Sequence, residues 1–90
     1  MSSHEDFMLI AQAMSSRSKD PSTKVGAVIV DNGFISALGY NHVPARIQFS
    51  DRQIENREWK YPRTIHAEVD AILKLGKQFV THAVMYCTHF

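Results

Sequence analysis

The segment that most constrains the fold is residues 25–30, a short run rich in β-branched side chains without polar alternation. Such a run is typical of a strand covered on both faces of its sheet, because both sets of side chains then need apolar neighbours. Asp31-Asn32-Gly33 follows, and Asn-Gly readily adopts the positive φ values of a tight hairpin turn. Residues 34–40 are then predicted to return as a second strand. We expect this hairpin to belong to a layered α/β arrangement.

The first helix is predicted over residues 5–17, where apolar side chains recur on one helical face. The four positions with this spacing are Phe7, Ile10, Ala11 and Met14. Ser3 is the expected N-cap, because a serine hydroxyl can accept from the free amides of a first turn. Asp20-Pro21 is expected to end the helix, since the residue before proline is pushed out of the helical region.

The second helix is predicted over residues 65–77, with Thr64 as its cap and Gly76 near its end. The positions assigned to its apolar face are Ile65, Val69, Ile72 and Leu73. Residues 83–87 are predicted to form a third strand. The expected order is therefore helix, hairpin, long loop, helix and strand.

The loop over residues 41–64 is long, polar and irregular. Loops longer than about 15 residues in a compact domain are usually functional or disordered. Residues 51–59 are predicted to form a short charged helix, and the loop fits either a binding lid or a solvated surface excursion. Trp59 is expected to anchor the loop to the body of the domain rather than to stack on a base.

Composition excludes several classes of protein. The chain has 90 residues, enough for one domain, and ten basic against nine acidic side chains, which argues against a nucleic-acid binder with a basic face. No apolar stretch is long enough to cross a membrane. The single cysteine, Cys87, excludes an internal disulfide framework, so a cytoplasmic protein is expected.

The chemistry is concentrated in His66-Ala67-Glu68, at the predicted start of the second helix. A neutral imidazole is a common zinc ligand. A glutamate two residues later can reach a metal-bound water and move its protons. An isolated His-x-Glu also fits a capping histidine beside a glutamate stabilised by the helix dipole, so the tripeptide alone leaves both interpretations open.

Four stretches together resemble the deoxycytidylate (dCMP) deaminases of the cytidine/deoxycytidylate deaminase family. They are residues 18–30 (SKDPSTKVGAVIV), 39–41 (GYN), 61–62 with 66–72 (YP and HAEVDAI), and 85–90 (MYCTHF). In the family these form the first loop and strand, the end of the second strand, the entry to the catalytic helix, and the strand that runs into Pro-Cys-x-x-Cys. The resemblance extends from about Phe7 to the last residue.

The resemblance implies a three-layer cytidine-deaminase-like α/β fold, with residues 1–90 as the N-terminal portion of a single domain. It also implies zinc-dependent hydrolysis of dCMP to dUMP and ammonia, which supplies dTMP precursors. His66 would be a zinc ligand, and Glu68 would carry a proton from the zinc-bound water to ring N3 and then to the leaving amine. Asn41 and Ala67 would contact the substrate.

The resemblance further implies a homo-oligomer, often a hexamer, that responds to dCTP and dTTP. Gly39, Tyr40 and Asn41 would belong to the allosteric nucleotide region. His42 stands where the family usually has the glycine that ends Gly-Tyr-Asn-Gly, so regulation by these nucleotides is an open question. We expect His42 itself to be an exposed loop histidine.

The sequence ends at Phe90, where the family continues into Pro-Cys-x-x-Cys with two thiolate zinc ligands. A catalytic zinc takes three protein ligands and a water, and His66 supplies one. Cys87, His82 and His89 are candidate substitutes, but we expect Cys87 to pack in the core and His82 to be solvated.

Two other interpretations remain. One is a tRNA adenosine deaminase or a riboflavin-pathway deaminase, although the long segment between Asn41 and His66 and the balanced charge favour the dCMP type. The other is a metal-free fragment or paralogue that binds nucleotide or assembles with a deaminase. Zinc content separates this last interpretation from the enzymes.

Overall fold

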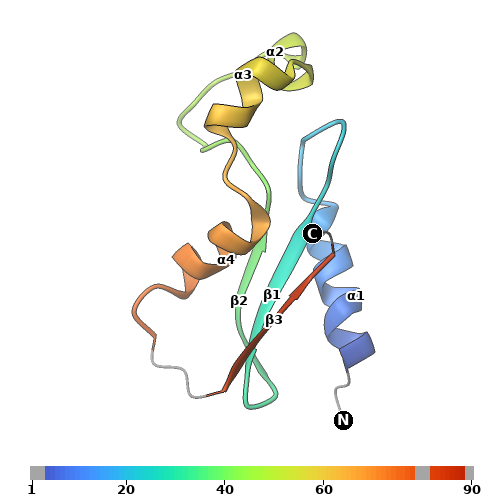
Figure 1. Ribbon diagram of the computed structural model, residues 1–90, viewed down its shortest axis with the longest axis vertical. Coiled ribbons are helices and arrows are strands. Elements are labelled where there is room, and N and C mark those ends of the chain that lie inside the picture. The colour runs from blue at the N-terminus through green and yellow to red at the C-terminus, as the bar shows by residue number, and fades with distance from the viewer. Residues whose placement is uncertain (1–3, 79–81, 89–90) are drawn as a thin grey trace.

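The computed structural model describes residues 4–78 and 82–88 (Figure 1). Its elements are α1 (His4–Ser15), β1 (Gly26–Asp31), β2 (Phe34–Tyr40), α2 (Asp51–Glu55), α3 (Arg57–Lys60), the 3-10 helix η1 (Tyr61–Arg63), α4 (Ala67–Leu75) and β3 (Ala83–Cys87). The three strands form one antiparallel sheet in the order β2-β1-β3. No helix among the described residues is long and apolar enough to cross a bilayer.

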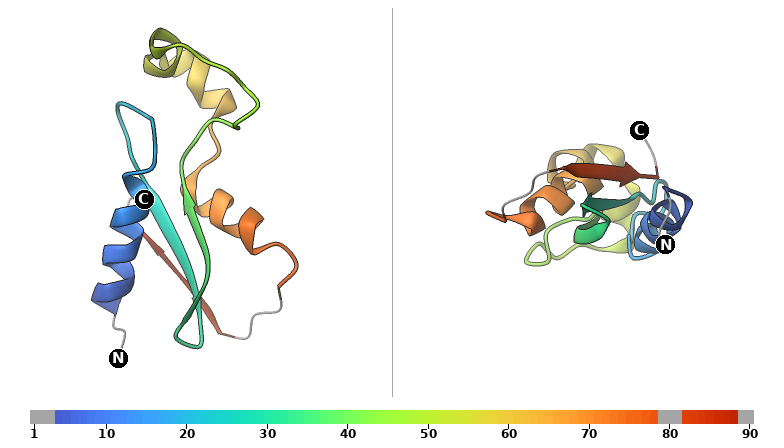
Figure 2. Two further views of the ribbon diagram at one scale, coloured as in Figure 1. Left: turned by 180° about the vertical axis from the view of Figure 1, so that it is seen from behind. Right: turned by 90° about the horizontal axis from the view of Figure 1, so that it is seen from below.

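Strand β1 occupies the centre of the sheet and is covered on both faces. Ala27 and Ile29 pack in one cluster with residues of α4, while Val28 and Val30 pack in another with α1. The two helices accordingly lie on opposite sides of the sheet (Figure 1 and Figure 2). The predicted layered α/β arrangement is confirmed, because the unbroken apolar run of β1 needs a helix against each face.

The β1–β2 turn forms where the Asn-Gly pair predicts it. Asn32 has a φ of 51° and Gly33 a φ of 81°, the left-handed values that a tight hairpin turn requires. The pairing register shifts between Ile29 and Val30, which marks an irregularity of the kind that increases local twist.

Helix α1 ends at Ser15, so the prediction that Asp20-Pro21 ends it is wrong. The hydroxyl of Ser15 donates to the carbonyl of Gln12 at 2.6 Å, and the hydroxyl of Ser16 donates to that of Ala13 at 2.6 Å. These side chains compete for carbonyls of the last turn, which favours an early end to the helix. The predicted cap Ser3 lies outside the described residues.

Helix α4 begins at Ala67 with His66 as its N-cap, and the predicted cap Thr64 is wrong. The hydroxyl of Thr64 donates instead to the Lys60 carbonyl at 2.7 Å. His66 thus occupies the cap position and Glu68 the first turn, as in the capping interpretation of His-x-Glu, but the side chain of His66 makes no capping hydrogen bond.

The apolar face predicted for α4 is also wrong. Ala67, Asp70 and Ala71 are buried against the sheet, whereas the most exposed large apolar side chains of α4 are Val69, Ile72 and Leu73, at 45%, 53% and 63%. The cause is close approach to the sheet: a Cβ on Gly39 would lie 2.5 Å from both the Ala67 carbonyl oxygen and the Ala71 nitrogen. Only small side chains fit such a contact, and a periodicity of apolar residues does not register side-chain size.

Residues 41–64 form an excursion that lies beyond one end of the sheet (Figure 1). The predicted helix over residues 51–59 is present as two short helices, α2 and α3, and Ser50 forms a capping box with Gln53 at the start of α2. Trp59 packs against Phe49 and under the Arg63 guanidinium, which both belong to the same excursion, so the prediction that it anchors the loop to the body of the domain is wrong.

Candidate active site

A cleft of about 970 Å³ opens beside the N-terminal end of α4. His66, Ala67 and Glu68 line it from α4 and its cap, and Met85 and Cys87 line it from β3. The loop before β1 and the end of the excursion supply the remaining walls. The structure thus brings the predicted metal ligand and the predicted catalytic carboxylate to one cleft.

The two side chains differ in their surroundings. His66 is exposed, and its backbone carbonyl accepts the first helical hydrogen bond of α4, from the Asp70 amide at 2.8 Å. Glu68 is half-buried in the first turn of α4, where the helix dipole favours a carboxylate. The thiol of Cys87 contacts Glu68 Oε2 at 3.6 Å. Histidine and glutamate therefore border the same space from neighbouring positions on one helix.

Asn41 also lines the cleft, but its side chain has a structural task that the sequence did not indicate. The residue is 5% exposed. Its Oδ1 accepts from the Val25 amide at 2.9 Å, and its Nδ2 donates to the Thr23 carbonyl at 2.8 Å. Asn41 thereby holds the loop before β1 in place, as a rigid edge of the cleft. Ala67, 1% exposed, brings backbone rather than a bulky side chain to the same wall.

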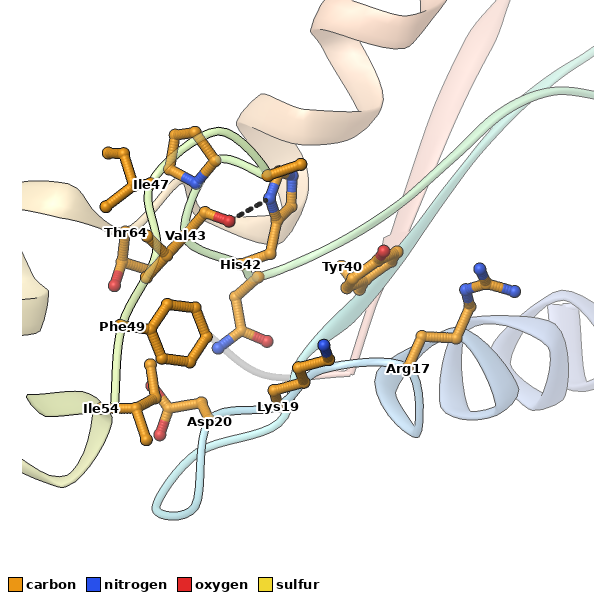
Figure 3. Close-up of a pocket in the computed structure, with 13 residues that line it drawn as sticks. Arg17, Lys19, Asp20, Tyr40, His42, Val43, Ile47, Phe49, Ile54 and Thr64 are labelled. Carbon is orange, nitrogen blue, oxygen red and sulfur yellow. Dashed lines mark hydrogen bonds between the residues drawn. The ribbon is translucent and has the colours of Figure 1, made fainter. Parts of the chain in front are cut away.

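A second cavity of about 240 Å³ shares the lining residues Asp20, Asn41 and Thr64 with the cleft (Figure 3 shows this cavity). Arg17, Lys19 and Tyr40 border it, and Phe49 and Ile54 add apolar surface. The Tyr40 ring lies under the Arg17 guanidinium, 5.6 Å from its centroid. Of the residues predicted for an allosteric region, Tyr40 and Asn41 reach this cavity, whereas Gly39 packs against α4.

His42 is not the exposed loop histidine that we expected. Its Nε2 lies 2.9 Å from Asp70 Oδ1, and its Nδ1 lies 3.2 Å from the Val43 carbonyl oxygen (Figure 3 shows the second contact). Both partners are hydrogen-bond acceptors, and the ring of His42 lies between them. The side chain of His42 is 27% exposed, and that of Asp70 is 6% exposed.

Asp70 joins three groups around the base of α4. Besides His42, it accepts from Lys74 Nζ at 2.9 Å and from the Tyr40 amide at 3.1 Å. Burial alone would raise the pKa of Asp70, but the hydrogen bonds from His42, Lys74 and the Tyr40 amide outweigh burial and lower that pKa. Sequence reasoning missed this residue, because an aspartate in a helix is ordinarily solvated.

Asp20 and Lys60 form a buried ion pair, and Asp20 also lines the cleft. Lys60 Nζ lies 2.9 Å from Asp20 Oδ1, and the same oxygen accepts the amides of Ser22 and Thr23. Burial favours a higher pKa for Asp20, but the hydrogen bonds from Lys60 and the two amides lower it. The sequence shows no signal for this pairing, since the partners are 40 residues apart.

The described residues contain no group of three His, Cys, Asp or Glu side chains placed to hold a metal. His66 fits one ligand position because its ring makes no capping bond. Cys87 is buried among apolar residues and His82 is exposed, as expected, while His89 lies outside the described residues. Within that part of the chain, a zinc site is therefore not complete.

The model of the cytidine and deoxycytidylate deaminase zinc-binding region matches residues 1–90, so the chain belongs to this family. A protein of Aliivibrio fischeri described as an uncharacterized deaminase in the luxG 3′ region is 40% identical over 84 residues, covering 93% of this chain and 56% of that protein. The deoxycytidylate deaminase of Homo sapiens is 38% identical over 94 residues, covering 96% and 52%. The chain thus spans about half the length of these relatives.

Solved structures give the same result. The apo form of dCMP deaminase from cyanophage S-TIM5 superposes with a TM-score of 0.79 at 29% identity, covering 96% of this chain and 64% of that one. The same enzyme in complex with dCMP and dUMP gives a TM-score of 0.76 at 30% identity. The predicted family and the cytidine-deaminase-like fold are confirmed.

Proposed function

We propose that the protein catalyses the hydrolytic deamination of dCMP to dUMP and ammonia. The observation that carries this proposal is the placement of His66 and Glu68 on the edge of one cleft, in a chain of this family. A related enzyme has been solved in complex with dCMP and dUMP, and relatives at 39% and 35% identity carry the names deoxycytidylate deaminase and probable deoxycytidylate deaminase. Supply of dUMP for dTMP synthesis in the cytoplasm is part of the same proposal.

In this reaction water adds to C4 of the cytosine ring and the C4–NH₂ bond breaks. The carboxylate of Glu68 takes a proton from the attacking water and passes it to ring N3. It then takes the proton of the new C4 hydroxyl and delivers it to the amine, which leaves as ammonia while the C4 carbonyl forms. A half-buried carboxylate at the edge of a cleft suits this task, because it reaches the substrate while partly shielded from bulk water. The fixed edge at Asn41 and the backbone at Ala67 would orient the pyrimidine.

Zinc is the proposed cofactor, and His66 is the described residue that fits it. When bound, Zn²⁺ supplies a water of lowered pKa. Since three protein ligands are needed, two must come from outside the set of side chains described above. We also propose that residues 1–90 form the N-terminal portion of a single deaminase domain.

The cavity at Tyr40 supports a second part of the proposal, the binding of effector nucleotides such as dCTP or dTTP. Arg17 and Lys19 offer positive charge beside an apolar floor, a combination that suits phosphate and base together. A homo-oligomer, as in a hexamer, is the assembly that the family suggests.

The test is to incubate the purified protein with zinc and four substrates in turn: dCMP, cytidine, tRNA and the amino-pyrimidine precursor of riboflavin. Conversion of dCMP alone supports the proposal, and preferential turnover of tRNA or of the riboflavin precursor overturns it. Bound zinc is measured on the same sample. A protein with no zinc and no turnover that still assembles with a full-length deaminase would establish the metal-free interpretation instead.

A further inference from the structure

The ion pair between Asp20 and Lys60 joins the two loops that border the active-site cleft. Its side chains are 10% and 3% exposed, and neither has a part in the proposed chemistry. Burying two charges costs free energy that pairing only partly offsets, and apolar residues often fill such a site equally well. The pair therefore calls for a role beyond holding the fold together.

Lys60 determines where one wall of the cleft lies. It is the last residue of α3, and Tyr61 and Thr64, which follow it, both line the cleft. The Thr64 hydroxyl donates to the Lys60 carbonyl at 2.7 Å, and the Thr64 amide donates to the same carbonyl at 2.8 Å. A displacement of Lys60 is thus transmitted directly to Tyr61 and Thr64.

Asp20 determines where the opposite wall lies. Its Oδ1 accepts the Ser22 amide at 2.9 Å and the Thr23 amide at 3.1 Å, which bends the loop before β1. Thr23 and Val25, farther along this loop, line the cleft. Asp20 itself contacts both the cleft and the cavity at Tyr40.

The three short helices of the excursion, α2, α3 and η1, contact one another rather than the helices and strands of the body. Helices α2 and α3 lie together beyond the end of the sheet (Figure 1 and Figure 2). Among the ion pairs between described residues, Lys60–Asp20 is the one that joins α2, α3 or η1 to the rest of the chain. The ion pair therefore links the two segments that form opposite walls of the cleft.

We propose that Asp20 and Lys60 are positioning residues that set the width of the cleft and thereby its affinity for the pyrimidine nucleotide. This inference rests on the proposed deaminase function. It predicts an effect on substrate binding and little effect on the chemical step, because Glu68 lies on α4 and contacts neither member of the pair.

The test is the double variant D20N/K60M. Asparagine keeps an oxygen for the Ser22 and Thr23 amides, methionine keeps the length of the lysine stem, and no unpaired charge remains buried. We expect KM for dCMP to rise about tenfold or more with kcat within about threefold of the wild type. The control K77M, which removes an exposed lysine beyond α4, should change neither constant. An unchanged KM, or a loss confined to kcat, would overturn the proposal.

A second readout does not depend on dCMP turnover. Amide hydrogen exchange in the double variant should rise about tenfold over residues 22–25 and 60–65, with β1 and α1 unchanged. Unchanged exchange in both loops, or a rise throughout β1 and α1, overturns the positioning role. If the wild type does not deaminate dCMP, the proposed function fails, and exchange alone decides whether the pair couples the two walls.

Discussion

His42 and Asp70 are 28 residues apart in the sequence, and their side chains meet at 2.9 Å under the Tyr40 backbone. The contact ties the segment that leaves β2 to the helix that carries Glu68. The same segment pairs with Ile65, just before His66, through hydrogen bonds of 3.0 and 2.8 Å. The position of His66 and Glu68 therefore depends on a polar network as well as on the apolar core.

Replacing Asp70 with alanine should destabilise the protein by about 2–3 kcal/mol, because the Tyr40 amide, the His42 ring and the Lys74 ammonium lose their common acceptor. Urea denaturation followed by circular dichroism measures this change in the free energy of unfolding. A double-mutant cycle with H42A should give a coupling energy of at least about 1 kcal/mol. If the two changes in the free energy of unfolding add to within about 0.3 kcal/mol, the His42–Asp70 contact does not contribute to stability.

Acid should weaken the fold below about pH 4. The folded-state pKa values of Asp20 and Asp70 are lowered from 3.8, so the unfolded chain binds protons more readily than the folded chain. The stability that these carboxylates contribute is therefore complete above the unfolded-state pKa and is lost as the pH falls through the folded-state pKa. Urea titrations across this range check the slope. The D20N/D70N variant should show a flatter dependence, and an equal slope would contradict the assignment.

Gly39→Ala should cost about 2–3 kcal/mol, because the new methyl group would press into the backbone of α4. It should also lower deaminase activity, since α4 carries Glu68. Gly33→Ala is the control without a steric clash: nothing lies within 4 Å of the added atom, and the left-handed φ of 81° alone costs about 1 kcal/mol of backbone strain. Thermal denaturation compares the stability of the two variants. Equal losses of stability would mean that close packing of α4 is not the cause of the loss in Gly39→Ala.

Much of this architecture could be predicted locally. The ranges of β2 and β3 match the predicted ones, because β-branched runs and an Asn-Gly turn specify strands through neighbouring residues alone. The His66–Glu68 spacing likewise needs only one helical turn to place both side chains at one cleft. The roles expected for these two side chains come from the family resemblance, because the spacing alone leaves two interpretations open.

The features that escaped prediction depend on contacts between distant segments. Lys60 looks like a solvated lysine until the loop carrying Asp20 is folded against it. Asp70 looks like a surface residue, and Ile72 like a core residue, until Gly39 brings α4 close enough for its alanines to form the buried face. Side-chain size and long-range pairing decided these positions, and neither is expressed in a periodic pattern of hydrophobicity.

Turnover of dCMP by the wild type beside the E68Q variant tests the central claim most directly, with formation of dUMP as the readout. Glutamine keeps the shape of Glu68 but cannot accept and return the proton, so the rate should fall by at least about 10³-fold. The control E58Q removes an exposed carboxylate of α3 and should leave the rate unchanged. Rapid formation of dUMP by the wild type and E58Q, with almost none by E68Q, is the predicted result. No dUMP from the zinc-loaded wild type, or an equal rate from E68Q, would contradict the account.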